Sequence, residues 1–259
     1  MYAPMQESMF SVLDSTNSIR IKEKVSVIEA ASAIIGQEIE MANRYSVHDR
    51  STGAQLFYAV EQTGCLARQL KQLCSDCAPW SVDILAGGPG GMAPAVKMER
   101  PFSCTCCCFN RPTVQILNAN SAETMGYVTD PCTFCNYNFY VRDAGGRNII
   151  AAEGGCCQWG ICCPCPCGPC SEVNFDLTDP QSGTNIGRLQ KKVPGILKFF
   201  LAPDVDNYTV EFTNPQGWSA QKKMLAIALS IFMDFRLFSE NPNDDEGGLI
   251  GAMSGDGYQ

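Results

Sequence analysis

Short apolar runs separated by turn residues make up most of the chain. Within many runs apolar and polar positions alternate, and glycine, proline, asparagine and aspartate separate one run from the next. This pattern is typical of antiparallel β-hairpins. The predicted hairpins cover residues 47–58, 82–98, 113–128, 140–150 and 173–189, and a last pair joins 196–200 to 208–213. About a dozen strands of similar spacing usually close into a barrel, because closure removes exposed strand edges.

Two segments depart from this alternation and favour a helix. Residues 25–42 have apolar positions near helical spacing, which fits a short amphipathic helix or an irregular strand. Residues 220–238 are apolar on every face of a helix over their central part, which requires burial in protein or in lipid. The apolar positions that define this membrane or core helix are Met224, Leu225, Ile227, Leu229, Ile231 and Phe232.

Length and charge favour a protein environment for this C-terminal helix. The uncharged run 224–233 spans roughly 15 Å at ~1.5 Å per residue, about half of a ~30 Å hydrocarbon core. A spanning helix would also take Asp234 and Arg236 into the bilayer, where each charge costs about 2.5 to 3.5 kcal/mol near the centre. We therefore predict a mainly β fold, a closed antiparallel barrel of about twelve strands around this helix. A single transmembrane pass of the helix is the alternative.

Composition narrows the class of protein. The chain has 259 residues, 45% of them hydrophobic, so it can bury a real core. We expect one domain over residues 19–240, a flexible tail at 1–18 and an acidic flexible tail at 241–259. A net charge of −8 without a long basic run argues against nucleic acid as the main partner. The sequence contains no G-x-S-x-G elbow, no phosphate-binding P-loop motif and no H-E-x-x-H motif, so we expect no enzyme activity.

Sixteen cysteines stand beside a single histidine, His48. The N-terminus lacks a basic segment followed by an apolar one, so we expect no secretory signal peptide and place the cysteines in the reducing cytosol. Adjacent cysteines are poor disulfide partners, which leaves metal ligation or acylation as their interpretation. Two C-x-x-C pairs have the spacing of structural zinc ligands and would form one Zn²⁺ site if the fold brings them together. They consist of Cys132, Cys135, Cys167 and Cys170.

A series of ordered motifs runs from Phe10 to Glu240. It includes Asn43-Arg44-Tyr45, Glu99-Arg100-Pro101 before a cysteine run, Gly126-Tyr127-Val128, Pro131-Cys132, Val173-Asn174-Phe175, Gly187-Arg188-Leu189, Gly195-Ile196-Leu197, Asp204-Val205-Asp206-Asn207-Tyr208 and Met233-Asp234-Phe235. Together these motifs resemble the phospholipid scramblase family, whose barrel-around-a-helix fold is shared with the Tubby-like proteins. The resemblance implies ATP-independent, Ca²⁺-stimulated, bidirectional movement of phospholipids between leaflets, without covalent chemistry.

The resemblance also implies a mode of membrane attachment. The family's acylated run corresponds to Cys104, Cys106, Cys107 and Cys108. Two or more palmitoyl chains anchor a protein stably, because each buried CH₂ adds about 0.8 kcal/mol. We therefore expect the chain at the cytosolic face of the plasma membrane, with the phospholipid bilayer as its partner. Buried thiols or metal ligands are the alternative for this run, and further acylation is the alternative to zinc for the later cysteines.

The family's proposed Ca²⁺ segment corresponds to a stretch near residue 204. Its candidate ligands are Asp204, Asp206, Tyr208, Val210 and Glu211. Carboxylates at the first and third positions of a loop suit a hard cation. The stretch departs from an EF-hand-like loop, because Thr209 stands where glycine is expected and Pro215 where a carboxylate is expected. We expect weak Ca²⁺ binding, and a turn with solvated aspartates is the alternative.

Two other function classes stay open from the sequence. One is a membrane-anchored lipid-binding or adaptor protein of Tubby-like fold that does not itself scramble lipids. The other is a zinc-stabilised, cysteine-rich cytosolic interaction domain. A helix-filled barrel has no lumen, so scrambling would need homo-oligomerisation, insertion of the helix, or local thinning of the bilayer. The small basic group Arg188, Lys191 and Lys192 is interpreted as an exposed strand end or a patch that touches anionic lipid.

Overall fold

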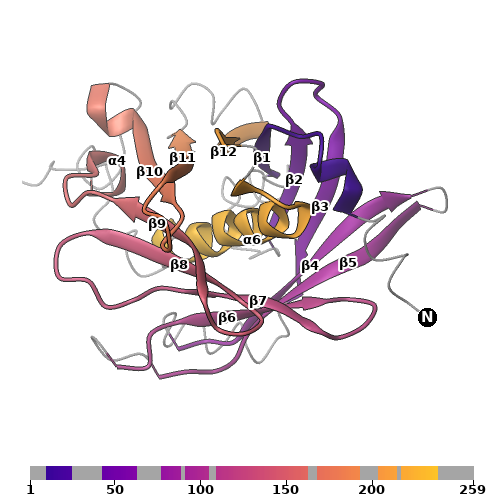
Figure 1. Ribbon diagram of the computed structural model, residues 1–259, viewed down its shortest axis with the longest axis horizontal. Coiled ribbons are helices and arrows are strands. Elements are labelled where there is room, and N and C mark those ends of the chain that lie inside the picture. The colour runs from indigo at the N-terminus through magenta and orange to yellow at the C-terminus, as the bar shows by residue number, and fades with distance from the viewer. Residues whose placement is uncertain are drawn as a thin grey trace, which may run out of the picture.

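Twelve strands form one closed antiparallel barrel in the computed structural model (Figure 1). The structure describes residues 10–24, 43–62, 77–88, 91–104, 109–162, 168–192, 204–214 and 217–238. The strands are β1 (Ser18–Lys24), β2 (Arg44–Asp49), β3 (Gln55–Glu61), β4 (Trp80–Gly88), β5 (Gly91–Arg100), β6 (Thr113–Asn118), β7 (Thr124–Thr129), β8 (Tyr137–Asp143), β9 (Asn148–Gly154), β10 (Glu172–Thr178), β11 (Asn185–Lys192) and β12 (Asp204–Phe212). Each strand pairs with the next along the chain, and β12 closes the barrel on β1.

The strands form where the sequence alternates. In β6, alternate positions are fully buried and their neighbours half-buried, so one face points into the barrel. Local turn chemistry then sets the register of each hairpin. Asp49 accepts hydrogen bonds from the backbone N–H groups of Ser51 (2.7 Å) and Thr52 (3.1 Å). Gly53 follows with φ of +73°, a conformation that favours glycine, and the chain turns from β2 into β3.

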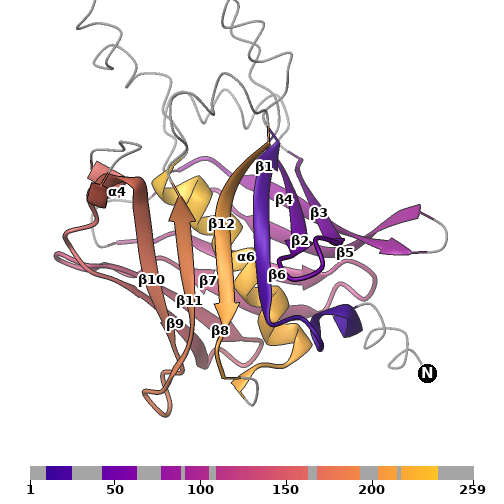
Figure 2. The ribbon, with the colours of Figure 1, turned by 90° about the horizontal axis from the view of Figure 1, so that it is seen from above.

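Helix α6 (Ala220–Leu237) runs through the interior of the barrel, as both ribbon views show (Figures 1 and 2). Its N-cap is Ser219, whose hydroxyl accepts a hydrogen bond from the N–H of Lys222 at 3.2 Å. All residues from Lys223 to Asp234 are buried, including the six apolar positions that define the predicted helix. The prediction of a barrel around a hydrophobic C-terminal helix is therefore confirmed. Of the helices in the described ranges, none has both the length and the hydropathy required to cross a bilayer.

Strand β7 makes a close approach to this helix at Gly126. A Cβ atom at that position would lie 2.4 Å from the backbone oxygen of Arg142 and 3.2 Å from a methyl group of Leu225 on α6. Glycine is therefore required here by space, and its absence of a side chain lets the helix pack against the sheet.

The two ends of the barrel differ. Because all neighbouring strands are antiparallel, alternate connections lie at the same end. One end, which we call the turn end, carries the hairpin connections β2–β3, β4–β5, β6–β7, β8–β9 and β10–β11. The opposite end, which we call the loop end, carries the longer connections, including α4 (Trp159–Cys162) and η2 (Gly168–Ser171) between β9 and β10. Helix α6 begins near the turn end and finishes at the loop end.

The structure differs from the predicted N-terminal tail in its last part. The 3-10 turn η1 (Ser11–Leu13) buries Phe10 and Leu13 in the core that surrounds α6, and β1 begins at Ser18. The apolar residues here are too few to form a periodic pattern, so the sequence alone did not show that they cover the end of the barrel. Strand β12 also begins earlier than predicted, at Asp204. The predicted segments 25–42, 196–200 and 241–259 lie outside the described residues.

Candidate functional site

Large exposed aromatic side chains gather at the loop end. They are Phe102, Phe109, Phe134 and Trp159, with exposed fractions of 60%, 76%, 107% and 57%. These residues lie in three different connections, β5–β6, β7–β8 and β9–β10. The other large hydrophobic residues exposed in the described ranges, Val12 and Met92, lie in η1 and at the start of β5, toward the turn end. Exposed rings concentrated on one side of a molecule are typical of an interaction surface or a membrane interface.

The cysteines that the structure describes lie at the same end. By position in the sequence, all sixteen fall within four of the loop-end connections, β3–β4, β5–β6, β7–β8 and β9–β10. Cys104 is exposed and follows Phe102 in the β5–β6 connection. The other three residues of the predicted acylated run, Cys106, Cys107 and Cys108, are outside the described residues. Within the described residues, the loop end therefore combines exposed rings with cysteine side chains.

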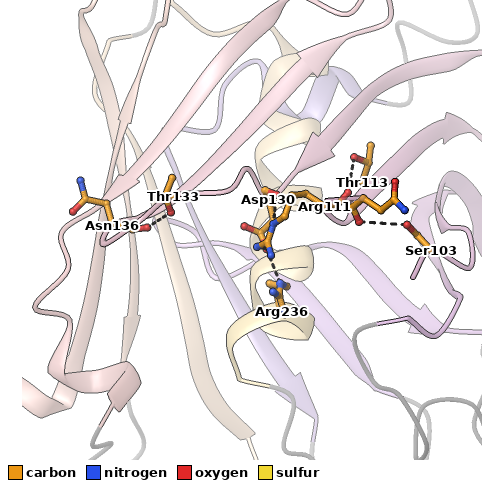
Figure 3. A network of polar contacts seen from close by, with 8 residues as sticks. Ser103, Arg111, Thr113, Asp130, Thr133, Asn136 and Arg236 are labelled. Carbon is orange, nitrogen blue, oxygen red and sulfur yellow. Dashed lines mark hydrogen bonds and ion pairs between the residues drawn. The ribbon is translucent and has the colours of Figure 1, made fainter. Parts of the chain in front are cut away.

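A polar network fixes the base of the β5–β6 connection to the end of α6 (Figure 3). Asp130, just after β7, is buried and accepts a hydrogen bond from Nε of Arg236 on α6 at 2.6 Å. Its carboxylate also pairs with Arg111, which precedes β6, and Arg111 donates from Nε to the backbone oxygen of Asp130 at 3.2 Å. The Ser103 hydroxyl lies 3.4 Å from the backbone oxygen of Asn110 across the cysteine run. Two connections of the loop end and the helix terminus are thus held together by one carboxylate.

A second network is buried inside the barrel around Asp234 of α6. The Asp234 carboxylate accepts hydrogen bonds from Tyr45 Oη at 2.8 Å, from Tyr208 Oη at 2.9 Å and from Lys191 Nζ at 2.7 Å. The Lys191 ammonium also lies 3.4 Å from the ring centre of Phe238. Burial, and then the nearby Asp234 charge, raises the pKa of Tyr45 and of Tyr208 well above the usual value.

The Asp234 network corrects one interpretation made from the sequence. The sequence pattern predicts Lys191 at an exposed strand end or in a patch that touches anionic lipid, but Lys191 is buried and paired with Asp234. Lys191 is buried because it lies on the inner face of β11. Its charge is tolerated there because Asp234 of α6 supplies a carboxylate as its partner. Lys192 is exposed, and Arg188 pairs with Asp176 on the outer surface.

The other end of α6 is anchored by a lysine. Lys223 Nζ donates to the backbone oxygens of Leu13 and Thr16, at 2.7 Å each, and lies 3.3 Å from that of Asp14. Burial lowers the pKa of Lys223. The helix is therefore fixed at its first turn to the η1 segment and near its last turn to three strands.

The candidate Ca²⁺ ligands lie on a strand. Asp204 and Asp206 are in β12, in register with Lys24 and Lys22 of β1. The side chains of Tyr208 and Val210 point into the core, while Glu211 pairs with Arg50 on the outer surface. Tyr208, Val210 and Glu211 therefore do not converge on one point. Weak Ca²⁺ binding stays a prediction, and among the described residues no cluster of three or more metal-binding side chains is present.

The candidate zinc ligands lie in neighbouring connections. Cys132 and Cys135 are in β7–β8 and Cys170 is in η2, whereas Cys167 lies outside the described residues. Cys132 is disulfide-bonded, so in this state it offers no thiolate to a metal. A hydrogen bond with the thiol of Cys156 raises the pKa of Cys135. The zinc site stays a prediction.

Sequence reasoning missed the exposed rings and the shared location of the cysteines. The shared location of the cysteine-bearing connections could have been found from the sequence. These connections alternate with hairpin turns along consecutive antiparallel strands, and alternate connections lie at the same end of a barrel. The rings and the Asp234 partners gave no comparable signal, since Tyr45 and Lys191 are separated from Asp234 by 189 and 43 residues.

Comparisons with known proteins give one consistent result. A family model described as Scramblase matches residues 1–240. Among curated proteins, phospholipid scramblase 2 of Bos taurus is 26% identical over 212 residues, which cover 82% of this chain and 66% of the relative. Phospholipid scramblase 1 of Mus musculus is 23% identical over 235 residues, which cover 90% of this chain and 65% of the relative. The chain thus spans slightly less than two thirds of the length of these relatives. No solved structure gives a significant match.

Proposed function

Because the chain belongs to the scramblase family, we propose that it moves phospholipids in both directions between membrane leaflets, without ATP and with stimulation by Ca²⁺. The observation that carries this proposal is the family match over residues 1–240, and the matched relatives are themselves named phospholipid scramblases. The family suggests lipid movement without covalent chemistry, so no catalytic group is assigned.

The loop end is the side that we place against the membrane. Phe102, Phe109, Phe134 and Trp159 are exposed there, and aromatic rings are favoured at the level of lipid headgroups. Palmitoylation of Cys104, Cys106, Cys107 and Cys108 would add stable anchoring at the same end, on the cytosolic face of the plasma membrane. The turn end, with its short hairpins, would then face the cytosol.

The path of the lipid headgroup is constrained by α6. A polar headgroup crosses hydrocarbon only at a high desolvation cost, and a scramblase must lower that cost. The interior of the barrel is filled by buried apolar side chains of α6 and cannot serve as a polar channel while the helix stays in place. We therefore place lipid movement outside the barrel, where rings inserted at the loop end, in one copy or several, thin and disorder the bilayer.

The proposed Ca²⁺ stimulation centres on Asp204 and Asp206. Both are at the start of β12, which is the loop end of that strand, so a cation bound there would lie near the proposed membrane surface. Carboxylates suit Ca²⁺, and bridging to anionic headgroups would strengthen membrane contact. The register pairs with Lys22 and Lys24 place positive charges on the adjacent strand, which agrees with weak binding.

Lipid flip in proteoliposomes tests the proposal. Purified full-length protein is reconstituted with a fluorescent phospholipid, and dithionite quenches label that reaches the outer leaflet, with and without Ca²⁺ and ATP. We expect quenching beyond the protein-free level, increased by Ca²⁺, unchanged by ATP, and no longer Ca²⁺-responsive in the Asp204→Ala, Asp206→Ala double variant.

A matched double variant controls for loss of charge. Asp176 and Glu153 are an exposed register pair on the outer face of β10 and β9, so Asp176→Ala with Glu153→Ala also removes two carboxylates. This variant should keep its Ca²⁺ response. Quenching that stays at the protein-free level under all conditions contradicts the scramblase proposal.

A second candidate is a membrane-anchored lipid-binding or adaptor protein. It is favoured by the filled barrel, which needs no lumen if the protein only holds lipids or partners at a membrane. In that case the protein would sediment with phosphoinositide-containing vesicles and yet produce no flip. The third class, a zinc-stabilised interaction domain, requires retained Zn²⁺, which elemental analysis of the purified protein would detect.

A further inference from the structure

Two cysteines face each other beyond the end of one hairpin. Strands β8 and β9 are antiparallel, and their last pair at the loop end is Tyr137 with Gly154. Cys135 lies two residues before Tyr137, and Cys156 lies two residues after Gly154. Both positions lie just beyond the end of the ladder, in neighbouring connections on the same side of the barrel.

The thiols of the two residues interact. The thiol of Cys135 is hydrogen-bonded to that of Cys156. On its other side, Cys156 Sγ lies 3.8 Å from Sγ of Cys157. All three residues are exposed, so a small soluble reagent can reach them. Cys156 is thus the central sulfur of a row of three.

We propose that Cys135 and Cys156 are an oxidisable dithiol that forms a reversible cross-strand disulfide with peroxide as oxidant. The two thiols already interact in the folded protein, and a disulfide requires two cysteines that can approach each other in this way. Cys157 is the competing partner of Cys156. A bond between adjacent residues is geometrically unfavourable, which favours Cys135 as the partner.

The chemistry balances with hydrogen peroxide alone. One thiolate of the pair attacks a peroxide oxygen, the O–O bond breaks, and a sulfenic acid and hydroxide form; the proton that left the thiol converts the hydroxide to water. The second thiol then attacks the sulfenyl sulfur, the S–S bond forms, and the sulfenic oxygen leaves as a second water with the remaining proton. Two thiols are oxidised and one peroxide is reduced. Glutathione reverses the reaction by thiol–disulfide exchange.

The bond would act on the surface already described. Cys135 follows the fully exposed Phe134 in the β7–β8 connection, and Cys156 opens the β9–β10 connection that carries Trp159. A disulfide would join these two connections and fix their spacing. It would also remove both thiols from acylation or zinc binding, so oxidation and those modifications exclude each other at this site. The proposal does not depend on whether the protein scrambles lipids.

Disulfide mapping tests the proposal directly. The purified full-length protein is fully reduced, freed of reductant, treated with a stoichiometric amount of hydrogen peroxide, alkylated and digested without reduction for mass spectrometry. We expect a peptide that links Cys135 to Cys156, lost after treatment with dithiothreitol. The linked peptide should persist in Cys157→Ser and be absent from Cys135→Ser and Cys156→Ser.

Folding of the variants is checked by thermal unfolding and circular dichroism. Cys170→Ser, which removes a partly buried thiol in the same region, is the control and should keep the Cys135–Cys156 link. A link between Cys156 and Cys157, a link of Cys135 to any other cysteine, or Zn²⁺ that copurifies at the pair and blocks oxidation would each overturn the proposal. So would oxidation confined to single cysteines as sulfinic acid.

Discussion

Asp234 is the residue that joins the central helix to the wall of the barrel. Three donors from β2, β11 and β12 converge on its carboxylate, and both members of its ion pair with Lys191 are buried. Removing one partner of such a pair leaves an uncompensated charge away from water, which is more damaging than loss of the pair as a whole. Asp234 therefore stabilises the fold because Lys191 and the hydroxyl groups of Tyr45 and Tyr208 would lose their shared partner without it.

We expect Asp234→Asn to lower the free energy of unfolding by about 3 kcal/mol, because Lys191 keeps its charge and loses its counterion. Urea unfolding followed by circular dichroism measures this change. Asp176→Asn is the matched control, since Asp176 pairs with Arg188 on the surface, with both side chains more than half exposed. That change should cost less than about 1 kcal/mol. Equal effects of the two variants would contradict the buried-pair explanation.

Tyr45 and Tyr208 make stability depend on alkaline pH. Burial first, and the Asp234 charge second, raises the pKa of both phenols in the folded state above the unfolded value of about 10. The folded protein then holds these protons longer than the unfolded chain does. Their contribution is fully present below pH ~10 and decreases as pH rises above that value, by up to about 1.4 kcal/mol per pH unit for each tyrosine.

Tyr208→Phe should therefore reduce the steepness of this alkaline loss, although it also removes one hydrogen bond to Asp234. Urea unfolding at several pH values between about 8 and 11 gives the slope for each protein. The half-buried Tyr127, on the outer face of β7, provides the control Tyr127→Phe. The prediction fails if the slope of Tyr208→Phe matches that of the unaltered protein.

At the scale of elements, the helix and the barrel depend on close packing at Gly126. A Cβ there would meet the backbone of β8 and the side chain of Leu225 together, and backbone atoms cannot rotate away. Gly126→Ala should lower the unfolding free energy by roughly 1 to 3 kcal/mol, the usual effect of overpacking. Thermal unfolding measures the shift.

Gly87→Ala serves as the control for this change. Gly87 is also in a strand, but an added Cβ there would meet no atom within 4 Å. Its substitution should leave stability nearly unchanged or raise it slightly, because alanine restricts the unfolded chain. A similar loss in both variants would show that the effect is one of β propensity and not of packing against α6.

The elements that the sequence predicted are those in which local pattern and tertiary structure agree. Five hairpins and α6 were found because alternation, turn residues and an all-round apolar run each indicate one structure. Strand β1 was missed because its two buried isoleucines alternate with charged residues in a short segment next to the predicted tail. The start of β12 was missed because aspartate and asparagine favour turns, and pairing with β1 overrides that preference.

At the scale of the whole molecule, the barrel is chemically asymmetric. Strand order alone places the cysteine-bearing connections at one end, so this part of the candidate site could be predicted from the sequence. The exposure of the rings could not, since the sequence pattern does not show whether an aromatic residue in a connection packs against the core. Folding therefore creates the surface that we assign to the membrane, by leaving four rings without a place in a core that α6 already fills.

The assignment of the loop end to the membrane predicts which substitutions weaken vesicle binding. In protein made without acylation, Phe134→Ser with Trp159→Ser should reduce affinity for anionic vesicles roughly tenfold or more, because full burial of one large apolar side chain contributes about 1.5 to 3 kcal/mol. Sedimentation of the full-length protein with vesicles measures this affinity. Val12→Ser with Met92→Ser removes two exposed apolar side chains outside the loop end and should leave binding unchanged. If instead this second variant loses affinity and the first does not, the barrel approaches the bilayer by its turn end, and the exposed rings must serve a protein partner.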